Sequence, residues 1–77
     1  MDQPCDVSVD ARGLDCPLPL LKAKQALNKM TVGQTLEVTA TDQGSVRDFA
    51  VFSQQSGHAL LLSEESNGEY RYILRKA

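Results

Sequence analysis

Residues 6–41, DVSVDARGLDCPLPLLKAKQALNKMTVGQTLEVTAT, contain the pattern that decides the fold. Polar and apolar residues alternate at both ends of this stretch, in 6–10 and in 34–41, which is typical of strands that bury one face. Between them, residues 17–30 predict a helix, because apolar residues recur at spacings of three and four, at Leu20, Ala23, Leu27 and Met30. A strand–helix–strand unit usually joins parallel neighbours through a right-handed crossover, so this stretch predicts two parallel strands covered by a helix.

The rest of the chain adds a second helix and two more strands. The helix is expected at 45–56, with Asp42 as its N-cap and a buried stripe of Val46, Phe49, Ala50 and Phe52. Strands are expected at 58–63 and 69–75, around the hairpin signal Asn67-Gly68. The order β-α-β-α-β-β predicts an α/β (α+β) two-layer sandwich, with a four-stranded mixed sheet and both helices on one face. The other face of the sheet is expected to be polar and wet.

Length and composition restrict the class of protein. The 77 residues are enough for a single domain, 1–77, in which we expect residues 1–5 to be flexible. A hydrophobic content of 42% and a net charge of −2 exclude a disordered chain and argue against nucleic-acid binding through overall charge. No apolar run approaches the roughly 20 residues of a membrane span, and no signal peptide is visible. We therefore expect a cytoplasmic protein with no membrane partner.

Cys16 stands at the start of the first predicted helix, in the context RGLDCPLP of residues 12–19. We expect Cys16 at the N-cap, Pro17 at N1 and Pro19 at N3, because proline is tolerated where helical N–H groups have no partner. The half positive charge of a helix N-terminus favours thiolate over thiol, so we expect a lowered pKa for Cys16. Arg12 would strengthen this effect and Asp15 would oppose it; the sequence leaves their ranking open.

An isolated thiol of this kind suits sulfur transfer better than other thiol chemistry. The other cysteine, Cys5, is expected about 20 Å away, beyond the reach of a disulfide with Cys16. The one histidine, His58, is expected at the opposite edge of the sheet, too far away to act as a base for the thiol. The two cysteines form neither a CxxC pair nor a closed metal site. The alternative, a buried cysteine that merely caps a helix, fits the flanking prolines poorly.

Several charged residues are candidates for support of the thiol. Arg12 and Arg47 are both expected near the carboxyl ends of the strands, where they would steer an acidic partner or an RNA phosphate. Solvated surface charge is an equally good interpretation of both arginines. Asp42 is better explained as a helix cap than as an acid or base.

Three segments resemble the TusA/SirA family of small sulfur-carrier proteins: 10–27, 32–42 and 70–77. The specific feature is the CPxP motif within R-G-L-x-C-P-x-P, which includes Gly13. The resemblance implies that Cys16 accepts persulfide sulfur from a cysteine desulfurase or a rhodanese-like donor and passes it to an acceptor protein. It also implies that the sulfur is delivered to tRNA thiolation, molybdenum-cofactor synthesis or oxidative sulfur metabolism. The chain departs from the family at Asp15, where some members carry a basic residue, and at Gln43, where proline is frequent.

Two functions follow as alternatives. In the first, the chain is a sulfur carrier that performs half of a transferase reaction. It needs no metal or organic cofactor, because the sulfur atom itself is what it carries. Any contact with tRNA would be indirect or transient. In the second, it is a regulatory module that binds a protein or RNA through the wet face of the sheet. Cys16 would then act at most as a redox or sulfur sensor.

Overall fold

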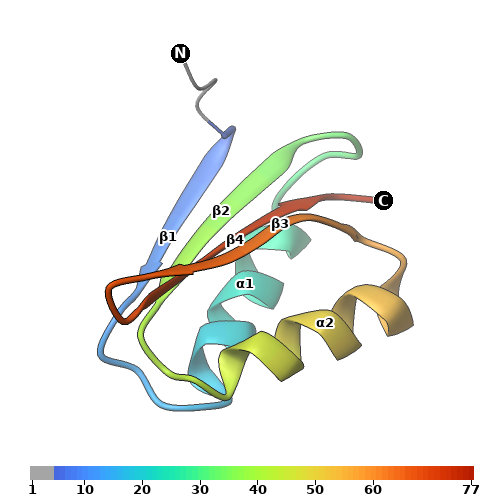
Figure 1. The fold of residues 1–77 in the computed structure, drawn as a ribbon. Coiled ribbons are helices and arrows are strands. Elements are labelled where there is room, and N and C mark those ends of the chain that lie inside the picture. The colour runs from blue at the N-terminus through green and yellow to red at the C-terminus, as the bar shows by residue number, and fades with distance from the viewer. Residues whose placement is uncertain (1–4) are drawn as a thin grey trace.

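Strands and helices alternate along the chain before a terminal hairpin (Figure 1), in a computed structural model that describes residues 5–77. The elements are β1 (Val7–Ala11), α1 (Leu18–Asn28), β2 (Thr35–Ala40), α2 (Ser45–Ser56), β3 (Ala59–Ser66) and β4 (Glu69–Arg75). The predicted order is confirmed. The prediction that residues 1–5 are flexible concerns mainly residues 1–4, which lie outside the described part of the chain.

The four strands form one mixed sheet in the order β1-β2-β4-β3. β1 and β2 are parallel, whereas β4 pairs antiparallel with both β2 and β3. Both helices lie under the same face of the sheet (Figure 1), which confirms the two-layer sandwich. Because β1 and β2 run in the same direction, the chain enters α1 and α2 at the same edge of the sheet.

The core lies between this face and the helices, as the alternation predicted. The sheet contributes alternate residues from two central strands: Leu36, Val38 and Ala40 of β2, and Tyr70, Tyr72 and Leu74 of β4. The helices cover them with Ala23, Leu27 and Phe49. The ring of Phe49 stacks on that of Tyr72, with centroids 4.3 Å apart and 12° between the planes.

The buried stripe of α2 differs from the predicted one. Val46 is 42% exposed and Ala50 is exposed as well, whereas Ser45 is only 1% exposed. The hydroxyl group of Ser45 lies 2.7 Å from the Tyr72 hydroxyl and donates to the Asp42 carbonyl oxygen at 2.6 Å. These bonds satisfy a polar group in the core, so the helix can turn its Ser45–Phe49 row toward the sheet.

Both helices begin later than their predicted caps. Pro17 is the N-cap of α1, so Cys16 lies one residue before the cap rather than at it, and Pro19 occupies N2 rather than N3. The Asp15 carbonyl oxygen accepts the Leu18 N–H at 2.8 Å and closes a turn just before the helix. Gly44, with no capping side chain, is the N-cap of α2, so the prediction of Asp42 as N-cap was wrong.

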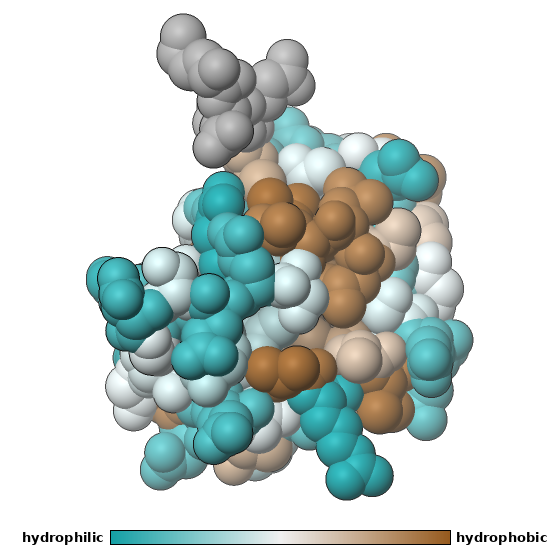
Figure 2. All heavy atoms as spheres, in the orientation of Figure 1, coloured by the Kyte–Doolittle hydropathy of each residue, from teal (hydrophilic) through white to brown (hydrophobic). Residues whose placement is uncertain are grey.

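The outer face of the sheet is mainly polar, as expected. Arg71 on β4 pairs with Glu37 and Glu64 on the two neighbouring strands. A bulge at Leu61 shifts the register of β3, so that Leu62 stands beside Ile73 on this face. Apolar side chains gather over the middle of the molecule in Figure 2, with hydrophilic ones beside them.

Candidate functional site

Cys16 is exposed in the loop between β1 and α1. The neighbouring loop, between β2 and α2, ends at Gly44, which lies directly beside it. A Cβ atom placed on Gly44 would be 3.6 Å from Cys16 Cβ and 3.8 Å from Cys16 Sγ. The candidate site is therefore the shared mouth of two helices, built by segments about 30 residues apart in the sequence.

The thiol of Cys16 points toward the first turn of α2. Its Sγ donates a hydrogen bond to Asp48 Oδ2, with 2.6 Å between the two atoms. Although Cys16 precedes α1, the direction of its side chain is therefore set by a residue of α2. Asp48 was absent from the sequence prediction, although the predicted topology already brought the first turns of both helices to one edge. An acidic residue in the first turn of 45–56 was the signal that could have identified it.

A second carboxylate, that of Asp42, also lies beside Gly44. Asp42 Oδ2 would be 3.0 Å from a Cβ on Gly44, so both Asp42 and Cys16 border the space above this glycine. Asp42 Oδ2 is buried and accepts no hydrogen bond from the described residues. A carboxylate oxygen without a donor adds negative potential beside the sulfur.

These carboxylates raise the pKa of Cys16 from its ordinary 9.0 to about 11. The hydrogen bond to Asp48 is the largest cause, followed by desolvation of the sulfur and by the negative charges of Asp48 and Asp42. The expected lowering of the Cys16 pKa is therefore wrong for the free protein. The helix contributes little to oppose this, because Cys16 stands outside it and the two prolines remove two of its N-terminal amides.

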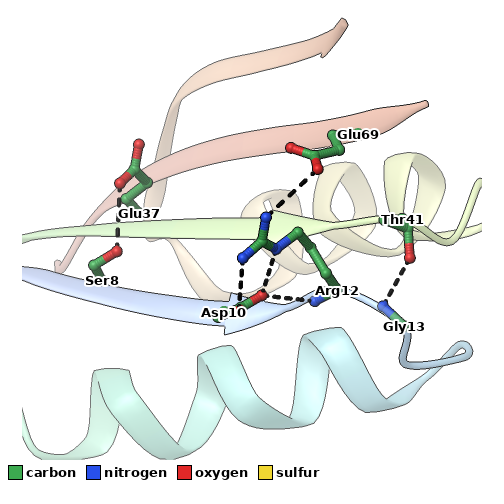
Figure 3. Close-up of polar contacts among 7 residues, drawn as sticks. All are labelled: Ser8, Asp10, Arg12, Gly13, Glu37, Thr41 and Glu69. Carbon is green, nitrogen blue, oxygen red and sulfur yellow. Dashed lines mark hydrogen bonds and ion pairs between the residues drawn. The ribbon is translucent and has the colours of Figure 1, made fainter. Parts of the chain in front are cut away.

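Arg12 turns away from the thiol, contrary to expectation. Its guanidinium pairs with the Asp10 carboxylate, at 2.9 Å between Nε and Oδ1, and with Glu69 at 3.6 Å (Figure 3). Asp10 and Arg12 are two residues apart on an extended segment, so both side chains point to the outer face of the sheet. The hydrogen bonds from Arg12 lower the pKa of Asp10 to about 2.

The other predicted supporting residues have varied positions. Gly13 adopts a φ of 79° and donates its N–H to Thr41 Oγ1 at 2.8 Å, which ties the Cys16 loop to the end of β2 (Figure 3). Asp15 is exposed and contributes its backbone carbonyl to the turn before α1. Arg47 is exposed in a groove between the helices, of about 310 Å³, which Asp48 also lines. Of the two predicted arginines, Arg47 alone lies near the site.

The other cysteine and the histidine are remote from Cys16. Cys5 is a free thiol just before β1, at the opposite end of that strand. His58 accepts the Ala77 N–H on Nδ1 at 3.0 Å, at the edge of the sheet where β3 begins, as predicted. Within residues 5–77, no three His, Cys, Asp or Glu side chains are grouped to hold a metal ion, and no helix has the length and apolar content to cross a bilayer.

Comparisons with known proteins agree with this architecture. The family model "Sulfurtransferase TusA" matches residues 7–76. The sulfur carrier protein TusA of Allochromatium vinosum is 49% identical over 72 residues, which cover 94% of this chain and 95% of that protein. A protein of Neisseria meningitidis serogroup A is 44% identical over 68 residues, 88% of this chain and 92% of its own.

A solved structure shares the fold. The SirA-like protein from Desulfitobacterium hafniense superposes with a TM-score of 0.78 over 90% of this chain and 95% of that chain, at 24% sequence identity. A family model that spans nearly all of the chain and a relative of almost equal length lead to one conclusion. This chain belongs to the TusA family of sulfur carriers.

Proposed function

We propose that Cys16 accepts a sulfane sulfur atom as a persulfide and passes it to an acceptor protein. The observation that supports this most is an exposed thiol at the shared mouth of two helices, with Cys5 and His58 at distant ends of the sheet. A disulfide oxidoreductase needs a resolving thiol within about 7 Å between Cα atoms, and a cysteine hydrolase needs a nearby base. A carrier needs neither.

The proposed loading step exchanges one S–S bond for another. The Cys16 sulfur bonds to the outer sulfur of a donor persulfide, R–S–SH, and the S–S bond of the donor breaks. The proton that leaves Cys16 ends on the donor sulfur, so the products are Cys16–S–SH and R–SH. Delivery is the same exchange with an acceptor thiol as the attacking group. No oxidant, reductant, metal or organic cofactor is consumed in either step.

Exposed apolar side chains near the thiol provide a surface for protein partners. Leu18 and Leu21 on α1 are each 45% exposed, and Val46 in the first turn of α2 is 42% exposed. Apolar contacts of this kind suit docking of successive partners over the same mouth. The donor we propose is a cysteine desulfurase or a rhodanese-like protein, and the acceptor a cysteine-bearing protein of tRNA thiolation or molybdenum-cofactor synthesis. We place this relay in the cytoplasm, where thiols stay reduced.

The test is intact-mass spectrometry after incubation with a cysteine desulfurase and L-cysteine. Wild type should gain about 32 Da, the mass of one sulfur atom in a persulfide. Cys5→Ser should gain the same mass, whereas Cys16→Ser should gain none. The regulatory alternative predicts no adduct on wild type, together with partner binding that Cys16→Ser leaves unchanged; that pair of results would overturn the carrier function.

A further inference from the structure

Asp48 connects the thiol to the groove between α1 and α2. Its Oδ2 accepts the hydrogen bond of Cys16, and the same side chain lines the groove between α1 and α2 with Leu20, Phe52 and Lys24. A partner seated in this groove would contact Asp48, the carboxylate that accepts the hydrogen bond of the thiol. The carboxylate can therefore respond to docking as well as act on the sulfur.

The geometry favours a proton on Cys16 in the free protein. In the 2.6 Å contact between Sγ and Oδ2, the sulfur is the donor when Asp48 is ionised, because an ionised carboxylate only accepts. Loss of the proton would leave two negative atoms in contact. The surrounding elements add negative charge: Asp15 precedes Cys16 in its loop, and Asp42 borders the Gly44 space. The pKa of Cys16, raised by Asp48 above all, agrees with this geometry.

In the part of the chain that the structure describes, the positively charged side chains of the neighbouring elements do not form an ion pair with Asp48. α1 has no charged residue in its first turn, and the cation that it contributes to the groove is Lys24. Arg47 of α2 lines the groove, while Arg12 is paired with Asp10 and Glu69 on the outer face of the sheet. Among the ion pairs of residues 5–77, none involves Asp48, so its carboxylate stays available to the thiol.

We propose that Asp48 is a positioning residue that holds Cys16 as a neutral, directed thiol in the unloaded protein, until a docked partner displaces or neutralises its carboxylate. This inference rests on the proposed sulfur-carrier function, which it extends to the control of reactivity. A protonated thiol reacts slowly with small oxidants and alkylating agents, because the thiolate is the nucleophile. The carrier would thus be protected between partners and reactive at a partner's surface.

The test measures the rate of Cys16 alkylation by iodoacetamide between about pH 6 and pH 10.5, in a Cys5→Ser background. The variants are Asp48→Asn, which keeps the shape but removes the charge, and Asp42→Asn as the matched control. If Asp48→Asn returns the pKa from about 11 to the ordinary 9.0, the thiolate fraction at pH 7.5 rises about 100-fold. The lower nucleophilicity of a less basic thiolate offsets about 8-fold of this. Because desolvation and Asp42 still raise the pKa in Asp48→Asn, this is an upper bound: we expect a rate increase of several-fold and at most about 10-fold over wild type at pH 7.5, and a smaller increase for Asp42→Asn.

Two outcomes would overturn the proposal. One is an alkylation profile of Asp48→Asn that superimposes on that of wild type. The other is an inflection near pH 9 in the alkylation profile of the parent protein, which would show an ordinary thiol. Sulfur loading by the desulfurase is measured separately on the same proteins. A normal adduct with an ordinary thiol profile would refute the role of Asp48 alone, whereas a missing adduct on wild type would refute the carrier function.

Discussion

The hydrogen bond between Ser45 and Tyr72 predicts that two substitutions removing the same contact differ in cost. Tyr72→Phe deletes one hydroxyl, and the remaining Ser45 hydroxyl keeps its bond to the Asp42 carbonyl oxygen. Because no buried polar group is orphaned, the free energy of unfolding should fall by about 1 kcal/mol, the net value of one hydrogen bond.

Ser45→Ala leaves the Tyr72 hydroxyl in the core without its partner. Tyr72 is fully buried, and Ser45 is its hydrogen-bond partner among the described residues. The cost of an unpaired buried hydroxyl adds to that of the lost bond to Asp42, so we expect a loss of about 2–3 kcal/mol. The better helix propensity of alanine returns no more than about 0.5 kcal/mol. In a domain of this size, each kcal/mol lowers Tm by about 4–8 °C.

Urea unfolding of wild type, both single variants and the double variant measures these differences. The double variant should be more stable than Ser45→Ala alone, because Tyr72→Phe removes the orphaned hydroxyl. A Tyr72→Phe variant as unstable as Ser45→Ala, or a double variant in which the two losses simply add, would contradict this reasoning.

Two further predictions concern the site and the outer face of the sheet. Gly44→Ala places a methyl group 3.0 Å from Asp42 Oδ2, so the Asp42 side chain must shift slightly, and 3.8 Å from Cys16 Sγ, where the methyl group covers one side of the sulfur. We expect slower persulfide loading at little cost in Tm, measured by the mass assay; loading at the wild-type rate would contradict this. Arg12→Gln should leave Cys16 alkylation unchanged, because Arg12 pairs with Asp10 and Glu69. The folded-state pKa of Asp10, about 2, lies below its unfolded value near 3.9, so its contribution to stability is present above about pH 4 and disappears as the pH falls toward 2. The urea midpoints of wild type and Arg12→Gln should therefore differ at neutral pH and converge near pH 2; a constant difference would refute the role of this pair.

Local pattern was sufficient to predict the architecture. Alternation in β1, β2 and β4 identified their buried faces, and the spacing of Ala23 and Leu27 identified the buried face of α1, because each depends on residues close in the sequence. The stripe of α2 was less predictable. The helix buries Ser45 rather than Val46 because a hydroxyl from β4, 27 residues away, pairs with it.

The protonation of Cys16 depends on similarly distant partners. The sequence identified Cys16 and its two prolines, and the predicted topology placed the first turn of α2 nearby. It did not show that Asp48, 32 residues further on, would accept the thiol hydrogen. The N-terminus of α1, taken alone, predicted that Cys16 would be a thiolate. Arg12 was misplaced for the opposite reason, because its pairing with Asp10 is local and the two-residue period of an extended segment already predicts it.

The position of β4 between β2 and β3 has a consequence for how the protein matures on the ribosome. The β1–α1–β2 unit emerges first, whereas β3 has no partner in the sheet until β4 has been synthesised. The rings of Tyr72 and Phe49 stack only then, and α2 settles with Asp48 against the thiol. A nascent chain thus exposes Cys16 for many residues of translation before the carboxylate that restrains it is in place.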